Sequence, residues 1–104
     1  MAKKRIPLHP GAFIKGVYIE EGELTITAIA EGLGVNKSTL SRIMRGQTDV
    51  TPSMAVKLSV VLGRTAESWL SMQQAHSLAK AQAEIKAARW KPAKRLVEGR
   101  LEAA

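Results

Sequence analysis

The strongest structural signal in this chain of 104 residues is the segment Ile26-Thr27-Ala28-Ile29-Ala30-Glu31-Gly32-Leu33-Gly34-Val35-Asn36-Lys37-Ser38-Thr39-Leu40-Ser41-Arg42-Ile43. Apolar residues recur at helical spacing in each half of it, which predicts two short helices, roughly over residues 26–33 and 37–45. Gly34 stands between them, where a tight turn needs the positive φ that glycine adopts at little cost. We expect Asn36 to be the N-cap of the second helix. This layout predicts a helix-turn-helix.

The outer face of the second predicted helix is polar and basic, and such side chains form hydrogen bonds with base edges and phosphates. We therefore expect this helix to enter the major groove of DNA, N-terminus first. Arg42 suits guanine, while Asn36 either caps the helix or reads adenine. A plain cap at Thr25, and a solvated basic face at Arg42 and Arg45, are the alternatives. The expected DNA-binding residues are Thr25, Thr27, Asn36, Lys37, Ser38, Thr39, Arg42, Arg45, Gln47 and Thr48.

The charge balance agrees with a polyanionic partner. Sixteen Lys and Arg residues against nine Asp and Glu residues give a formal net charge of +7. Positive charge is concentrated in residues 35–57, where Asp49 is the one acidic residue. Basic proteins are often merely soluble, but this position beside the predicted turn favours nucleic acid.

Composition also bounds the class of protein. Hydrophobic residues make up 45% of the chain, enough for one domain with a modest core. There is no cysteine, which excludes disulfides and favours the cytoplasm. No apolar run approaches the roughly 20 residues that cross a bilayer, and the basic start of the chain lacks the apolar run of a signal peptide. We expect a cytoplasmic protein.

Three further helices complete an expected all-α fold. The first opens at His9-Pro10-Gly11 and ends at Glu21-Gly22; its predicted inner face is Phe13, Ile14, Val17 and Tyr18. The fourth follows a Thr51 cap and Pro52, and the long fifth follows Thr65 and could run to Trp90. The predicted organisation is a basic arm (1–8), the helical domain (9–90) and a basic tail (91–104) that is partly disordered or helical.

Catalytic chemistry has little support in this sequence. The two histidines, His9 and His76, are far apart along the chain; we expect the first to cap a helix and the second to be packed or solvated. No paired carboxylates, glycine-rich phosphate loop or metal-ligand cluster is evident. We expect no enzyme activity, no cofactor and no metal site.

Beyond these patterns, the chain from His9 to about residue 85 resembles the HigA-type (VapI-like) antitoxins, within the XRE (Cro/CI-type, lambda-repressor-like) helix-turn-helix class. The segments that carry the resemblance are His9-Pro10-Gly11, Val35-Asn36-Lys37-Ser38-Thr39-Leu40-Ser41-Arg42, Val50-Thr51-Pro52 and Trp69-Leu70-Ser71-Met72-Gln73. Residues 86–104 match no motif of that family.

The resemblance implies a homodimer that binds a palindromic operator in its own promoter and represses its operon. It also implies a partner toxin, a small mRNA-cleaving endoribonuclease of the RelE/HigB type. The family's dimer contact lies around the fourth and fifth helices, although Trp69 is also expected in the core. The dimer candidates are Val60, Val61, Trp69, Leu78 and Ile85. A free-standing repressor without a toxin and a pure protein-binding module are the alternatives.

Overall fold

The structure is a computed structural model that describes residues 6–97, and within that range it contains helices and no strand. The expected all-α fold is therefore confirmed. The predicted arm (1–8) and tail (91–104) lie partly outside the described residues. The elements are α1 (Pro10–Phe13), η1 (Ile14–Glu20), α2 (Ile26–Leu33), α3 (Lys37–Met44), α4 (Pro52–Leu62) and α5 (Ala66–Ala87).

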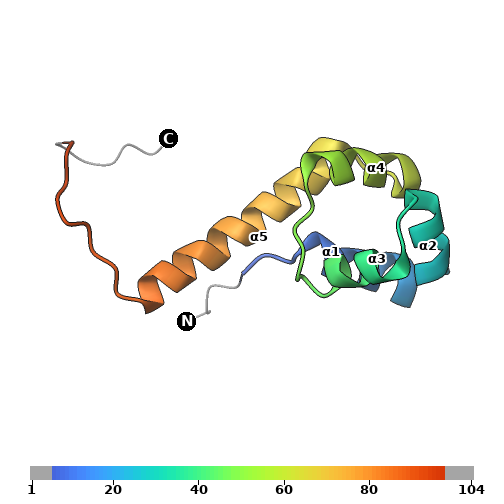
Figure 1. Ribbon diagram of the computed structural model, residues 1–104, viewed down its shortest axis with the longest axis horizontal. Helices are drawn as coiled ribbons and strands as arrows, with labels where there is room; N and C mark the ends of the chain where they lie inside the picture. Colours follow the sequence, from blue (N-terminus) through green and yellow to red (C-terminus); the bar gives the residue numbers. More distant parts are fainter. Residues whose placement is uncertain (1–5, 98–104) are drawn as a thin grey trace.

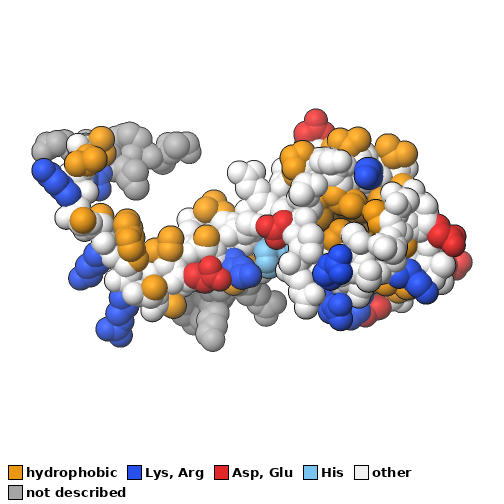
Figure 2. All heavy atoms as spheres, in the orientation of Figure 1, with side chains coloured by type: hydrophobic (Ala, Val, Ile, Leu, Met, Phe, Trp, Pro, Cys, Tyr) orange, Lys and Arg blue, Asp and Glu red, His pale blue; other side chains and the backbone are white. Residues whose placement is uncertain are grey.

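The elements from α1 to α4 and the start of α5 form one globular unit, and the rest of α5 extends away from it (Figure 1). Every residue from 80 to 97 is exposed. Figure 2 shows hydrophobic side chains as well as Lys and Arg side chains along this extension. No described helix has both the length and the apolar character needed to span a membrane.

The predicted inner face of the first helix needs one correction. Val17 is 41% exposed, and Ile19 packs against the core instead. The reason is that residues 14–20 form a π-helix, with bonds such as Glu21 N–H to the Gly16 carbonyl at 2.9 Å. Its i→i+5 bonds lengthen the turn and shift the side chains that follow Ile14 around the axis.

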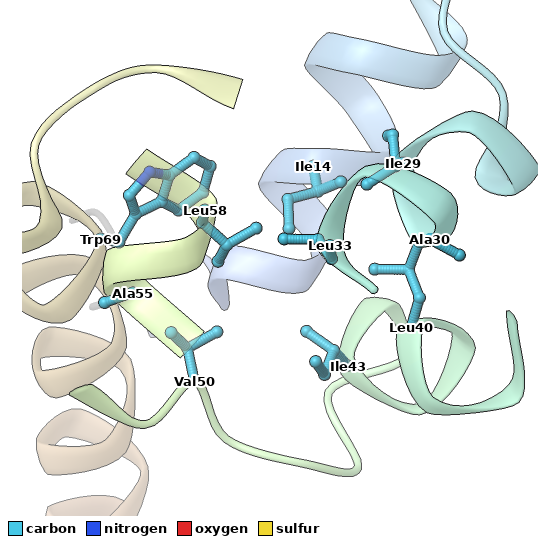
Figure 3. Packing of buried hydrophobic residues seen from close by; sticks show 10 residues of the cluster. All are labelled: Ile14, Ile29, Ala30, Leu33, Leu40, Ile43, Val50, Ala55, Leu58 and Trp69. Atoms are coloured by element: carbon cyan, nitrogen blue, oxygen red, sulfur yellow. The ribbon is translucent and has the colours of Figure 1, made fainter. Parts of the chain in front are cut away.

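The core is built from ten buried hydrophobic residues, which come from η1, α2, α3, the loop after α3, α4 and α5 (Figure 3). Trp69 is fully buried, and its Nε1–H donates to the Gly63 carbonyl at 2.9 Å. The rings of Phe13 and Tyr18 pack around it. The expectation that Trp69 lies in the core is therefore confirmed. The expectation that it contacts a dimer partner is wrong, because its side chain is buried inside its own domain.

α1 lies against α3 with no room for a side chain between them. A Cβ added at Gly11 would overlap the carbonyl group of Ile43. Glycine is thus required here by close approach rather than by an unusual backbone angle. This contact fixes α1 against the second helix of the predicted helix-turn-helix.

The helix boundaries follow local signals with one exception at the end of α5. α5 ends at Ala87, three residues before Trp90, the furthest end predicted for this helix. Arg89 has a φ of 57°, and the N–H of Trp90 donates back to the Ile85 carbonyl at 3.2 Å. A left-handed residue with such a bond closes a helix C-terminus, so the chain leaves the helix before Pro92 requires it to.

Candidate nucleic-acid interface

α2 and α3 form the predicted helix-turn-helix. Gly34 has a φ of 74°, and the N–H of Val35 bonds to the Ala30 carbonyl at 3.0 Å, which closes the turn. Leu40 and Ile43 on α3 are 0% and 3% exposed. Because these two side chains anchor one face of α3 in the core, the opposite face is held at the surface in a fixed orientation.

That outer face carries most of the residues expected to contact DNA. Lys37, Ser38, Arg42 and Arg45 are exposed, and none of them forms an ion pair or side-chain hydrogen bond in the part of the chain that the structure describes. The nearest charged contacts elsewhere, between Lys15 and Glu20 at 4.0 Å and between the His9 ring and Asp49 at 3.8 Å, involve none of these four residues. The exposure that base or phosphate contacts require is therefore present.

The expected side-chain cap at Asn36 is wrong. Asn36 occupies the N-cap position of α3, but its side chain makes no capping bond. Its Oδ1 instead accepts the Thr39 hydroxyl at 2.8 Å, a local alternative open to Asn. The first N–H groups of α3 therefore lack a side-chain partner, and such a helix end attracts anions.

Thr25 and Thr27 lie at the start of α2. The Thr25 Oγ1 accepts the Ala28 N–H at 3.0 Å, so the plain-cap reading of this residue is confirmed. Its hydroxyl hydrogen remains available for donation, because accepting a bond leaves the donor unused. Thr27 is exposed in the first turn of the same helix.

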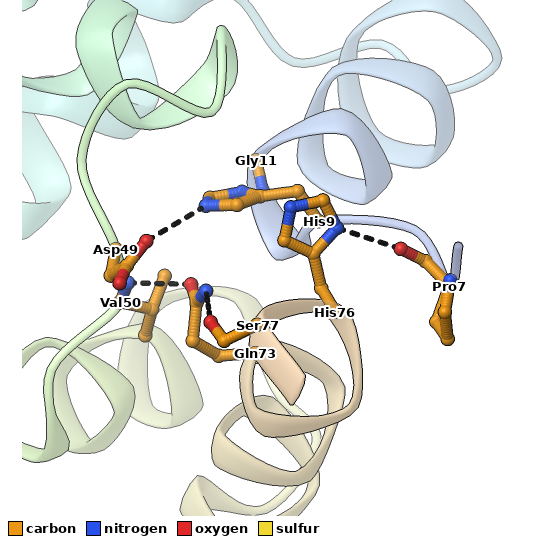
Figure 4. A network of polar contacts seen from close by, with 8 residues as sticks. All are labelled: Pro7, His9, Gly11, Asp49, Val50, Gln73, His76 and Ser77. Atoms are coloured by element: carbon orange, nitrogen blue, oxygen red, sulfur yellow. Dashed lines mark hydrogen bonds and ion pairs between the residues drawn. The ribbon is translucent and has the colours of Figure 1, made fainter. Parts of the chain in front are cut away.

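The loop after α3 carries the predicted residues Gln47 and Thr48, both exposed. Buried Gln73 of α5 holds the end of this loop: its Oε1 accepts the Val50 N–H at 2.7 Å, and its Nε2 donates to Ser77 Oγ at 2.9 Å (Figure 4). Sequence reasoning gave Gln73 no such role. Its position was a signal for this role, because Gln73 follows Trp69 by four residues and so lies on the same inner face of α5. A polar residue on that face needs a hydrogen-bond partner inside the protein.

A second polar contact joins the start of α1 to α5. The His9 Nδ1 accepts the Gly11 N–H at 2.9 Å, which confirms His9 as a cap. The proton of the neutral ring is then on Nε2, which is buried, has no hydrogen-bond partner and lies 3.8 Å from Asp49 Oδ1. The ring of His76 meets that of His9 edge-on at 5.0 Å, and its Nδ1–H donates to the Pro7 carbonyl at 2.7 Å (Figure 4).

Burial disfavours the charged form of His9 and is the main cause that lowers its pKa; the neighbouring His76 and Lys80 act in the same direction, and Asp49 opposes them. The described residues contain no group of three or more His, Cys, Asp or Glu side chains that could hold a metal ion. These contacts join the start of α1, the loop after α3 and α5.

The remaining dimer candidates differ in exposure. Val60, Leu78 and Ile85 are 80%, 56% and 51% exposed, whereas Val61 is partly buried against the core. Val60 lies on α4 and the other two exposed residues lie on α5. Three of the five predicted residues are thus surface residues.

Comparison with known proteins places this geometry in a family. A family model described as helix-turn-helix matches residues 18–70. The uncharacterized HTH-type transcriptional regulator YddM of Escherichia coli (strain K12) is 37% identical over 71 residues, which cover 68% of this chain and 76% of the relative. Antitoxin HigA-1 of Vibrio cholerae serotype O1 is 37% identical over 75 residues, covering 72% and 70%.

The solved structure of antitoxin GraA in complex with its operator has 31% sequence identity to this chain and a TM-score of 0.77. The match covers 94% of this chain and 99% of that one. The family match, the relatives and the shared fold agree with one another. The chain therefore belongs to the XRE-type helix-turn-helix family, the family of the HigA antitoxins.

Proposed function

We propose that this protein is a DNA-binding antitoxin that represses its own operon. One observation carries the DNA-binding part: the inner face of α3 is buried, while its outer face and its N-terminus present donors that the protein does not use. The likeness to an antitoxin solved with its operator supports the same assignment. The protein acts in the cytoplasm, where the operator lies.

In this proposal α3 enters the major groove with its N-terminus first. Lys37 and Ser38 lie at that end, and Arg42 follows one turn later, where its guanidinium binds O6 and N7 of guanine. The phosphate contacts come from two flanking segments. They are Thr25 and Thr27 at the start of α2, and Arg45, Gln47 and Thr48 after α3.

Two copies act together, because one helix offers few base contacts. A two-fold dimer matches a palindrome whose half-sites lie about 34 Å apart. The dimer surface includes the exposed side chains of Val60, Leu78 and Ile85. Val61 lies at its edge, since part of its side chain already packs against the core.

Toxin neutralisation is the second part of the proposal. It is supported by the relative named antitoxin HigA-1 and by the solved antitoxin structure. The partner is a small mRNA-cleaving endoribonuclease that the complex holds inactive.

Electrophoretic titration with the DNA upstream of this gene tests the first part. We expect a dimer-sized complex that prefers this DNA to a shuffled duplex of equal length and that weakens steeply with salt. No preference at low salt, with the dimer confirmed, would overturn the repressor function and favour a protein-binding module.

Co-expression with the product of the neighbouring gene tests the second part. We expect that the two proteins purify together and that the partner cleaves mRNA only after separation. Specific operator binding without any such partner would indicate a free-standing repressor.

A further inference from the structure

We infer that the C-terminal basic segment, residues 86–97, binds phosphates of the DNA that flanks each operator half-site. This inference rests on the proposed function and extends it to a part of the chain outside the helix-turn-helix. The family model ends at residue 70, well before this segment. The cations of the segment are Lys86, Arg89, Lys91, Lys94 and Arg95.

Four of the five cations of this segment have no acidic partner among the described residues. No acidic residue occurs between positions 85 and 97, and every residue in that range is exposed. Lys86, Arg89, Lys91 and Lys94 form no ion pair within the described residues. Exposed cations held near one another repel, and a polyanion relieves this repulsion.

The position of α5 brings the segment within reach of a duplex held by α3. Lys80 of α5 and Arg45 at the end of α3 line the same surface groove, with a volume of about 500 Å³. From Lys80 to Ala87 the helix rises about 10 Å. The following ten residues add at most about 35 Å if extended.

Along the chain, the cations of the segment can therefore lie at most about 45 Å from the groove beside α3. Phosphates of B-DNA continue beyond a half-site through that range, with one charge per about 1.7 Å of duplex axis. Figure 2 shows Lys and Arg side chains over the globular unit and again on the extension, on the same face of the molecule.

The apolar side chains of the segment do not favour a folded protein as the partner. Trp90, Leu96 and Val97 are 64%, 85% and 69% exposed, and they lie after the last helical turn rather than along one helix face. Protein interfaces depend on apolar anchors that enter a pocket together. Scattered cations on an irregular backbone match phosphate contacts, which need charge more than shape.

The test uses the full chain and two operator duplexes, one ending at the palindrome and one with about 15 natural base pairs on each side, a length chosen to exceed the reach above. The variants are Lys91→Gln, Lys94→Gln and the double substitution. Lys15→Gln is the matched control, because Lys15 is an exposed cation on η1, far along the chain from the segment.

We expect that the wild type binds the longer duplex more tightly and with a steeper salt dependence. Each single substitution should make the slope of log K against log salt shallower by about 0.9, and only on the longer duplex. Preference for the operator over a shuffled duplex should stay unchanged in all variants, and Lys15→Gln should behave as the wild type.

Equal affinities and slopes for the double variant and the wild type on the longer duplex would overturn the inference. If the same variant then lost co-purification with a partner protein, the segment would be a protein-binding element instead. Loss of operator preference by the wild type itself would overturn the proposed function, and the flanking contact with it.

Discussion

The N-termini of α1, α2, α4 and α5 differ from the N-terminus of α3. In the first four, a side chain accepts a backbone N–H of the first turn; the caps are His9, Thr25, Thr51 and Thr65. At α3 the residue in the same position, Asn36, bonds to Thr39 instead. Four α-helices thus have a side-chain cap at the N-terminus, and α3 has none.

The same contrast separates the two sides of the loop after α3. On the core side, Gln73 of α5 holds the loop through a buried bond to Val50. On the outer side, Gln47 and Thr48 are exposed. Changes on the core side should therefore cost stability, and changes on the α3 face should cost binding.

The largest stability effect in this comparison is expected at Gln73. Gln73→Ala leaves the Val50 N–H buried without a partner, which costs about 1–3 kcal/mol. Ser77→Ala is the control, because it removes the outer bond of the same amide and leaves the Val50 contact in place. Urea unfolding measures both. Equal stability of Gln73→Ala and the wild type would show that water replaces the amide and that the loop is not held from α5.

Alanine substitutions at the N-cap positions of α4 and α3 form a matched pair. Thr51→Ala removes a bond to the Met54 N–H and should lower the free energy of unfolding by about 1 kcal/mol. Asn36→Ala removes no cap, so its effect on stability should be smaller. Operator binding should show the reverse order. A larger stability loss for Asn36→Ala would mean that this side chain caps α3 in solution.

A smaller effect is expected from pH. Burial and His76 lower the pKa of His9 below its ordinary value of 6.5, so below that pH the unfolded chain binds more protons than the folded one. The contribution of neutral His9 to the free energy of unfolding is therefore complete above pH 6.5. It is lost as the pH falls from 6.5 toward the lowered pKa. One proton gives a slope of at most about 1.4 kcal/mol per pH unit.

His9→Asn checks this expectation, because Asn is also a good N-cap but does not titrate. Urea unfolding between pH 5 and 7.5 should give a flatter profile for this variant than for the wild type. Parallel profiles would assign the acid sensitivity to another group.

Local signals were sufficient for most of the fold. Thr25, Thr51 and Thr65 are caps because a threonine before a helical pattern satisfies the N–H groups just after it. Gly34 was also predictable, because the turn between the two helices requires a positive φ, which glycine adopts readily. These features depend on neighbours within a few residues, which the sequence displays directly.

The corrections have causes that local patterns do not display. Val17 points outward because residues 14–20 adopt a π-helix, which periodicity at 3.6 residues does not anticipate. The Asn36 side chain could accept either a backbone N–H of the first turn of α3 or the Thr39 hydroxyl. Both lie at similar spacing, and the sequence pattern does not decide between them. The roles of Trp69 and Gln73 depend on segments that are distant in the sequence. Trp69 packs against several helices in the core, and Gln73 bonds to Val50.

The operator affinity of Arg42→Ala shows whether the outer face of α3 reads DNA. Arg42 is exposed and has no protein partner among the described residues, so its removal should leave the unfolding midpoint unchanged. We expect Arg42→Ala to lose about 1–3 kcal/mol of specific binding and Lys15→Ala, which removes a cation elsewhere on the surface, to lose little. Equal operator affinity for Arg42→Ala and the wild type would show that this face of α3 does not read the operator.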